Sequence, residues 1–235
     1  TEQLTSLSQP ANFLKTKVSF DDKGQMTTGK DNTGIQIALS MGITILLFVI
    51  ITSYSSIIAQ EIASEKGTRI MEVILSSTTA QTHFYGKLTG VILVALTQIV
   101  IYALAFVLGY SQLKNLAVVE EVLDGISLQT IFGPTMILTL LFFVVGILVY
   151  SVLAALCGSL VSKPEDTAKA VQPVMYIGMI GYIIGISLGA SDPQNIVIKV
   201  TSYIPFISSY IMPVRLATET ASVFEAIISL VILVI

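Results

Sequence analysis

Residues 61–87 read EIASEKGTRIMEVILSSTTAQTHFYGK, a charged stretch that joins two long apolar segments. At about 100° per residue, the first half of this stretch sorts into two faces of a helix. The polar face carries Glu61, Glu65, Thr68, Arg69 and Glu72. The opposite face carries Ala63, Gly67, Ile70, Met71 and Ile74, with Lys66 as the one charged residue among them. The sequence therefore predicts an amphipathic helix that continues from a membrane span and lies at or beyond the water boundary.

The composition is that of a membrane protein. Of the 235 residues, 54% are hydrophobic and only 11% are charged, and the mean hydropathy is +0.85. Soluble domains carry roughly 25% charged residues, and here the apolar residues are gathered in long runs. The fold class that we expect is an all-α polytopic membrane protein that is surrounded by the lipid bilayer. The net charge of −3 gives no reason to expect nucleic acid as a partner.

Five apolar runs mark the expected membrane spans. Four of them contain no Asp, Glu, Lys, Arg or His and are long enough to cross a bilayer: residues 34–60, 88–110, 135–161 and 171–190. The fifth run, residues 223–235, covers only ~20 Å of the ~30 Å hydrocarbon core at about 1.5 Å per residue. We therefore expect a truncated fifth span, and a sequence that is part of a longer protein.

The regions outside these spans differ in character. Residues 1–33 are polar and are expected to be the remnant of a soluble domain, with a short strand at Val18–Phe20. Residues 191–222 contain Pro205 and Pro213, which break any spanning helix, together with tyrosines that favour the headgroup level. This second region predicts short interfacial or re-entrant helices.

The distribution of Lys and Arg sets the expected orientation. Residues 61–87 and 163–169 together hold five of these residues, and the loops on the opposite side hold three. The positive-inside rule therefore favours a cytoplasmic location for the two segments. The four lysines of residues 1–33 oppose this arrangement unless they belong to a translocated domain, which the rule does not count.

Small and polar residues inside the spans indicate helix packing. Gly181, Gly185 and Gly189 form two overlapping GxxxG units, which predict a tight contact with another helix of this chain or of a second subunit. Five polar residues could either form hydrogen bonds within the bundle or line a substrate path: Ser40, Thr44, Thr97, Gln98 and Tyr102. The sequence does not separate these two roles. We expect Ser40 and Thr44 to serve helix packing and Gln98 to form an interhelical hydrogen bond.

The chain lacks the residues needed for chemistry of its own. The spans offer no ionisable group that could bind a coupling proton, which disfavours a secondary transporter. His83, the one histidine, cannot build a multi-histidine metal site. Gly86-Lys87 is not a P-loop, because Gln81 and Leu88 stand where the motif needs Gly and Ser or Thr. We expect no catalytic residue, metal or cofactor on this chain, and an energy source on another polypeptide.

Several short motifs resemble those of one family. The charged stretch is similar to the acidic-basic run, the Met-Glu step and the Gly-Lys pair of ABC-2-type permeases: Glu65-Lys66-Gly67-Thr68-Arg69, Met71-Glu72 and Gly86-Lys87. Two outer motifs resemble the family's segment before its last span: Ile204-Pro205-Phe206 and Met212-Pro213-Val214-Arg215. Within the family the chain is most similar to the NatB-like branch, whose members resemble sodium or drug exporters. One departure is residues 76–79, where many relatives have a proline.

The resemblance implies an architecture and a set of partners. The full protein would be a type V exporter-like membrane domain of six spans, with the first span upstream and residues 1–33 as the tail of an extracytoplasmic domain. It would pair with a second permease copy or homologue and with a separate ATP-binding cassette ATPase, which binds ATP and Mg²⁺. Residues 61–87 would be the coupling segment that docks on this ATPase, through Glu61, Glu65, Lys66, Gly67, Thr68, Arg69 and Glu72.

The implied function is export by alternating access across the plasma membrane of a bacterium. The uncharged spans favour lipophilic or amphipathic cargo, which opposes the sodium transport that the NatB-like branch suggests. Two alternatives use the same fold: a non-transporting sensor or assembly subunit, and a sodium exporter subunit. An ion channel is disfavoured, because no acidic ring or filter-like run is present. On the coupling surface, pairs of Arg69 with Glu65 and with Glu72 would offset the repulsion between the neighbouring acids.

Overall fold

The computed structural model describes residues 17–20, 26–29, 33–113, 134–218 and 220–235. By its internal contacts the chain divides into two units, Thr1–Gly34 and Ile35–Ile235. In the first unit, strand β1 (Lys17–Phe20) pairs antiparallel with β2 (Met26–Gly29), which confirms the short strand expected at Val18–Phe20. The origin of this unit as part of an extracytoplasmic domain stays a prediction.

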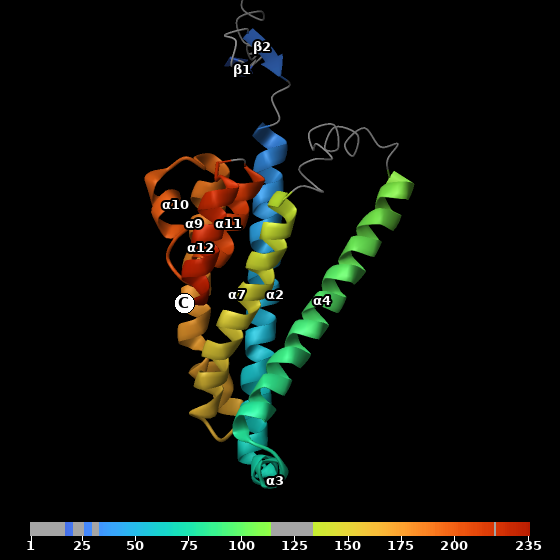
Figure 1. The fold of residues 1–235 in the computed structure, drawn as a ribbon, viewed down its shortest axis with the longest axis vertical. Coiled ribbons are helices and arrows are strands. Elements are labelled where there is room, and N and C mark those ends of the chain that lie inside the picture. The colour runs from blue at the N-terminus through green and yellow to red at the C-terminus, as the bar shows by residue number, and fades with distance from the viewer. Residues whose placement is uncertain (1–16, 21–25, 30–32, 114–133, 219) are drawn as a thin grey trace, which may run out of the picture. The chain divides into compact units, whose positions relative to one another are not determined.

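Every described element of the second unit is a helix (Figure 1). Four helices are long and apolar enough to cross a membrane: α2 (Thr33–Gly67), α4 (Ala80–Leu113), α7 (Pro134–Ser159) and α9 (Gln172–Ser191). Shorter helices connect or follow them: α3 (Ile70–Ser77), the 3-10 helix η1 (Pro164–Asp166), α8 (Thr167–Ala170), α10 (Ile196–Thr201), α11 (Ser208–Ala217) and α12 (Val223–Val234). This arrangement confirms the all-α membrane fold class, whereas the number of spans in the full protein stays a prediction.

The amphipathic helix expected from residue 61 is not one continuous helix. α2 ends at Gly67, and α3 begins only at Ile70. Between them, Arg69 adopts a left-handed backbone conformation with φ 62°, which ends one helix and redirects the next. α4 then begins at Ala80, about two helical turns before the expected start of the second span. The helical periodicity of the sequence holds within α2 and within α3, but it does not predict the break between them at residues 68 and 69.

α2 and α7 form the centre of the bundle. Gly158 of α7 lies against Ala59 of α2, where a Cβ on the glycine would come within 2.5 Å of the Ala59 carbonyl oxygen. Around this contact, buried side chains of α2, α4, α7, α9 and α11 form one apolar core. The buried residues of α4 in this core are Leu88, Val91 and Ala95, and beyond them α4 diverges from α2 and α7 (Figure 1). In lipid, such contacts stabilise the bundle through close packing and not through the exclusion of water.

The glycines of α9 lie against helices of the same chain. A Cβ on Gly181 would lie 2.6 Å from the ring of Tyr210 in α11, and one on Gly185 would lie 2.9 Å from the Thr44 side chain in α2. Gly189, one turn further on, faces α11 in the same way. The glycine pattern therefore has its partner helices, α11 and α2, within the chain.

The region with two prolines contains the short helices α10 and α11. α11 is buried from Ser208 to Leu216 although Pro213 lies inside it, because this helix packs against both α7 and α9. In the turn that precedes α11, Phe206 has a left-handed backbone conformation with φ 69°. The re-entrant position of α10 and α11 in the bilayer stays a prediction.

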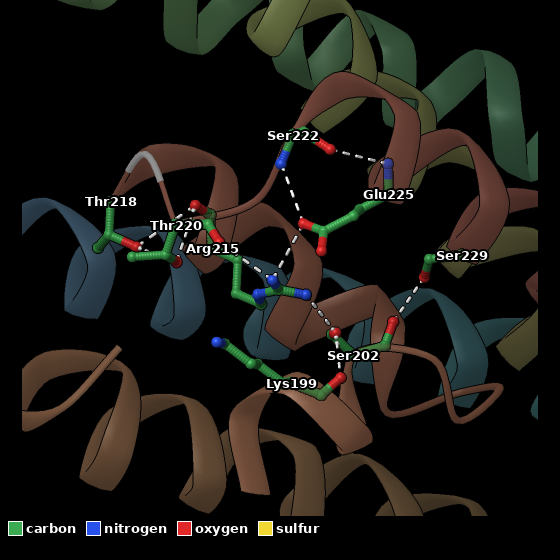
Figure 2. A network of polar contacts seen from close by, with 8 residues as sticks. All are labelled: Lys199, Ser202, Arg215, Thr218, Thr220, Ser222, Glu225 and Ser229. Atoms are coloured by element: carbon green, nitrogen blue, oxygen red, sulfur yellow. Dashed lines mark hydrogen bonds and ion pairs between the residues drawn. The ribbon is translucent and has the colours of Figure 1, made fainter. Parts of the chain in front are cut away.

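A buried arginine fastens α11 to α10 and α12 (Figure 2). Arg215 is 1% exposed, and its Nη1 donates a hydrogen bond of 2.8 Å to Ser202 Oγ. Its Nη2 donates to the Thr220 carbonyl at 3.0 Å and lies 3.1 Å from Glu225 Oε2 in the first turn of α12. Ser229 of α12 donates a further hydrogen bond, 2.6 Å long, to the Ser202 carbonyl. The cluster offsets the free energy needed to bury the guanidinium and joins three helices through it.

Loss of the Glu225 carboxylate should destabilise the protein strongly. We expect Glu225→Ala to lower the free energy of unfolding by about 3 kcal/mol, the lower end of the range for breaking a buried ion pair, because Glu225 is partly exposed. Reversible unfolding of the full-length protein by SDS titration, followed by circular dichroism, measures the change. Ser222→Ala is the matched control, since it removes the other half of the α12 capping box and should cost about 1 kcal/mol. Equal effects of the two substitutions would show that Arg215 does not depend on its carboxylate partner.

The close contact at Gly181 predicts that even one methyl group is not tolerated there. Gly181→Ala should destabilise the protein by about 1–3 kcal/mol, because the new Cβ would overlap the Tyr210 ring. Gly90→Ala in α4, where nothing lies within 4 Å of the added atom, should be neutral or stabilise by up to about 1 kcal/mol. The same titration compares the two variants, and equal stability would contradict this packing.

Candidate functional site

The predicted coupling residues gather at the end of the bundle where α2, α3 and α4 meet. Figure 1 shows α3 nearly end-on at this end, so that it runs across the axes of α2 and α4. α3 has no buried residue, in contrast to the long helices on either side of it. The short helix therefore forms an exposed bridge between two long helices.

Acidic residues of α2 and basic residues of α4 form an ion-pair cluster next to this bridge. Lys87 Nζ lies 2.9 Å from Glu65 Oε1 and 3.2 Å from Glu61 Oε2. His83 Nε2 lies 2.8 Å from Glu65 Oε2. Each of the two acids thus has a basic partner within the chain, which relieves the repulsion between them without a second protein. The cluster holds the last turns of α2 to the first turns of α4.

The prediction of local ion pairs around Arg69 is wrong. Within the described part of the chain, the Arg69 side chain forms no ion pair with Glu65 or Glu72. The break at Arg69 explains this, because the spacings expected to bring these side chains together hold only in a continuous helix. Arg69 and Glu72 are both exposed at the start of α3, and Thr68 beside them donates its hydroxyl proton to the Ser64 carbonyl.

Lys66 and Gly67 fasten the end of α2 to the end of α7. The Lys66 ammonium donates a hydrogen bond of 2.6 Å to the Ser159 carbonyl, one of the last carbonyls of α7, which have no partner inside their own helix. A Cβ on Gly67 would clash with the Ser162 carbonyl oxygen, so only glycine fits there. These contacts explain why a lysine stands on the otherwise apolar face of this stretch.

α3 has two apolar edges. Met71 and Leu75 face inward and line a cavity. Ile70 and Val73 are not among the residues that line the cavity, and they are 50% and 71% exposed. An exposed apolar edge next to charged residues is the kind of surface that a partner protein or a membrane covers.

The cavity behind α3 has a volume of about 540 Å³, which is typical of a small-molecule site. Its walls come from α2, α3, α4, α7 and the turn before α11, and most of its lining is apolar: Ile62, Met71, Leu75, Phe84, Leu153, Leu156 and Phe206. Two basic residues of the ion-pair cluster, His83 and Lys87, border it on one side. Phe206 packs edge-on against Tyr150 of α7, with 5.4 Å between the ring centroids.

The polar residues considered for a substrate path on α4 lie elsewhere. Gln98 accepts a hydrogen bond of 2.6 Å from the Tyr54 hydroxyl of α2, which is the interhelical bond expected for it. Its amide also donates to the Tyr102 hydroxyl one turn along α4. Thr97 donates its hydroxyl proton to the Leu93 carbonyl of its own helix.

Ser40 and Thr44 are fully buried inside the bundle. Thr44 donates a hydrogen bond of 2.7 Å to the Ser40 carbonyl, and Ser40 donates one of 2.9 Å to the Ile37 carbonyl. Thr44 also contacts the glycine face of α9. None of the five polar residues of the expected path lines the cavity, and the structure does not bring them together at one site.

Phe206 belongs to the motif Ile204-Pro205-Phe206, but the sequence predicted no place for it at a cavity. A positive φ is rare for phenylalanine, and no pattern in the sequence predicts it. Among the described residues, no group of three or more His, Cys, Asp or Glu side chains could hold a metal ion. The features that the structure does bring together are an exposed bridge, an ion-pair cluster and an apolar cavity.

Comparisons with known proteins supply the family. Residues 2–235 match the family described as ABC-2 family transporter protein. Uncharacterized protein YhaP of Bacillus subtilis (strain 168) is 33% identical over 189 residues, which cover 79% of this chain and 45% of that protein. Uncharacterized protein MJ1024 of Methanocaldococcus jannaschii is 30% identical over 200 residues, which cover 84% of this chain and 45% of that protein. No solved structure matches the chain.

The chain spans less than half the length of these two relatives, and both are described as uncharacterized. The NatB-like branch therefore stays a prediction. The family match, in contrast, covers nearly the whole chain, including the four apolar helices and the charged stretch between the first two of them. The chain belongs to the ABC-2 family of transporter proteins.

Proposed function

We propose that this chain is the permease part of an exporter driven by a separate ATP-binding cassette ATPase, and that α3 docks on this ATPase. The observation that carries the proposal is α3 itself, a helix without buried residues that is held across the ends of α2 and α4. Family membership supports the transport role. ATP and Mg²⁺ would bind to the partner, and this chain would supply the path through the membrane.

The proposed docking surface consists of Arg69, Ile70, Glu72 and Val73. All four residues are exposed, and they combine an apolar edge with one charge of each sign. The acidic residues of α2 are paired with Lys87 and His83 instead, so they act within the chain. A groove on the ATPase with an apolar floor and both basic and acidic groups at its rim would fit this surface.

Movement of α3 would reach the long helices through two contacts. Lys87 and His83 tie Glu65 at the end of α2 to the start of α4. Lys66 ties the same end of α2 to Ser159 at the end of α7. A partner that displaces α3 would therefore pull on α2, α4 and α7 together, at the end of the bundle where the cavity lies.

A second permease copy or homologue completes the proposed assembly in the plasma membrane of the cell. Large apolar side chains in the second half of α4 support this part of the proposal, since they are exposed where α4 diverges from the bundle: Val100, Ile101 and Leu104. Such a face suits contact with lipid or with a second subunit. The apolar spans favour lipophilic or amphipathic cargo.

Val73→Asp tests the docking surface. We expect the affinity of the full-length protein for its ATPase, measured by co-purification and titration in detergent, to fall about tenfold or more, because a charge would replace an exposed apolar anchor. Glu72→Lys should weaken binding as well. Phe224→Asp on α12, which replaces a side chain that is 72% exposed, is the matched control and should bind normally. If both Val73→Asp and Glu72→Lys bind the ATPase normally, α3 is not the docking surface.

Glu65→Gln separates docking from coupling. The substitution weakens the contacts with His83 and Lys87 but leaves the exposed surface of α3 unchanged. We therefore expect the ATPase to bind normally, while ATP-driven transport in reconstituted vesicles falls. Normal transport by this variant would exclude the ion-pair cluster as the mechanical link. ATPase binding without any transport by the unsubstituted protein would instead favour a sensor or assembly subunit.

A further inference from the structure

The cavity behind α3 ends at an aromatic wall. Phe206 lines the cavity and packs against Tyr150, with the ring planes at 87° and the centroids 5.4 Å apart. Tyr150 in turn packs edge-on against Tyr210 of α11, with 5.8 Å between centroids. Three rings, from α7, from α11 and from the turn before α11, therefore form a continuous aromatic contact from the cavity lining into the buried core.

Phe206 is the part of this wall that is placed to move. It lies in a turn and not inside a helix, its side chain is only half-buried, and its φ of 69° is unfavourable for any residue with a Cβ. Such conformations persist where neighbouring contacts hold them, and they concentrate at segments that change shape. Tyr150 and Tyr210, in contrast, are buried and lie within regular helices.

Four buried serines lie on the helices that form the bundle, two of them shortly after Phe206 in the chain. Ser208 and Ser209 follow Phe206 at the start of α11, and Ser55 and Ser151 lie on α2 and α7. All four serines are at most 1% exposed, and their hydroxyls have no hydrogen-bond partner among the described residues. Buried polar groups are normally paired, because an unpaired one destabilises the fold. These hydroxyls therefore point to a place that receives a polar molecule or group.

We propose that the cavity binds a small amphipathic molecule and that Phe206 is the gate between this cavity and the serine hydroxyls. The apolar body of the ligand would lie between α3, α4 and α7, with its polar group at the edge formed by His83 and Lys87. Movement of the Phe206 ring off Tyr150 would join the apolar cavity to the hydroxyl groups in one continuous route. Binding of the ligand needs no ATPase. The inference rests on the proposed function only for the step in which the bound molecule would be exported.

Photolabelling tests the cavity. The probe is an octanol that carries a diazirine, added to the full-length protein in phosphatidylcholine nanodiscs, with labelled residues identified by mass spectrometry. We expect label on residues 152–156 of α7 and about tenfold less label in Leu156→Trp, whose larger side chain fills part of the cavity. Leu141→Trp, on an exposed part of α7 outside the cavity, should keep the label. Equal labelling of the two variants would overturn the cavity as a binding site.

Two competitors distinguish a membrane lipid from a free amphiphile, which share the chemistry that the cavity accepts. Loss of label with added dodecanol alone identifies a site for free amphiphiles. Loss with added lysophosphatidylcholine alone identifies a lipid site, and loss with both identifies a site that accepts either. Full labelling in the presence of both competitors would overturn the proposed ligand class.

Ser209→Cys reports on the gate in a Cys157→Ser background, because Cys157 is the one native cysteine. Its modification by methanethiosulfonate ethylammonium should be slow while Phe206 is present and about tenfold faster in Phe206→Ala. Phe224→Ala is the matched control on α12 and should leave the rate unchanged. An unchanged modification rate of Ser209→Cys in the Phe206→Ala variant would overturn the gate. So would a rate that rises equally for Ser229→Cys, a buried position on α12, because the substitution would then have loosened the whole bundle.

The two proposals fail independently. Neither the photolabelling nor the cysteine assay contains ATP or the ATPase, so a protein that does not dock through α3 would still show the cavity and the gate. Conversely, failure of the cavity or the gate in these assays would not affect the test of docking. That test measures how strongly Val73→Asp binds the ATPase and does not involve the cavity.

Discussion

The close approach of α7 to α2 at Gly158 and Ala59 is the contact on which the rest of the bundle depends. In lipid, apolar side chains gain little from leaving their surroundings, so helices associate where their backbones pack densely and where polar groups bond across the interface. The α2–α7 pair uses both devices, because the glycine contact is followed by the hydrogen bond from Lys66 to Ser159. α9 uses glycines in the same way, with Gly185 against α2 and with Gly181 and Gly189 against α11.

A second glycine contact between the same two regions of the chain lies next to α3. The Ser162 carbonyl lies against Gly67 at the end of α2, so this end of the helix is packed closely on the link that follows α7. The chain then turns at Arg69, and the next eight residues form α3 across the ends of its neighbours. A helix in this position has little within the chain to pack against on its outer side. Its exposed apolar edge is thus a consequence of how the long helices are fixed.

Much of the fold could be predicted from the sequence, because span length and hydropathy are local properties that the bilayer dictates. The site was less predictable, since its contacts join residues far apart in the chain. Glu65 has its partners 18 and 22 residues further on, in another helix, and not at Arg69, four residues away. Arg215 counts as a loop charge in the positive-inside comparison, yet it is buried because α10 and α12 supply its partners. Nothing local predicts the positive φ of Phe206 either.

Backbone strain connects the two ends of the cavity. Among the described residues, Arg69 and Phe206 are the two non-glycine residues with positive φ. Arg69 precedes the helix whose Met71 and Leu75 line the cavity at one end, and Phe206 lines it at the other. Each such conformation costs roughly 1–3 kcal/mol and persists only while neighbouring contacts hold it. A partner that loosened the contacts of α3, or a ligand that displaced the Phe206 ring, would therefore release strain as it acted. The cavity therefore lies between the two described segments in which a non-glycine residue has a left-handed backbone conformation.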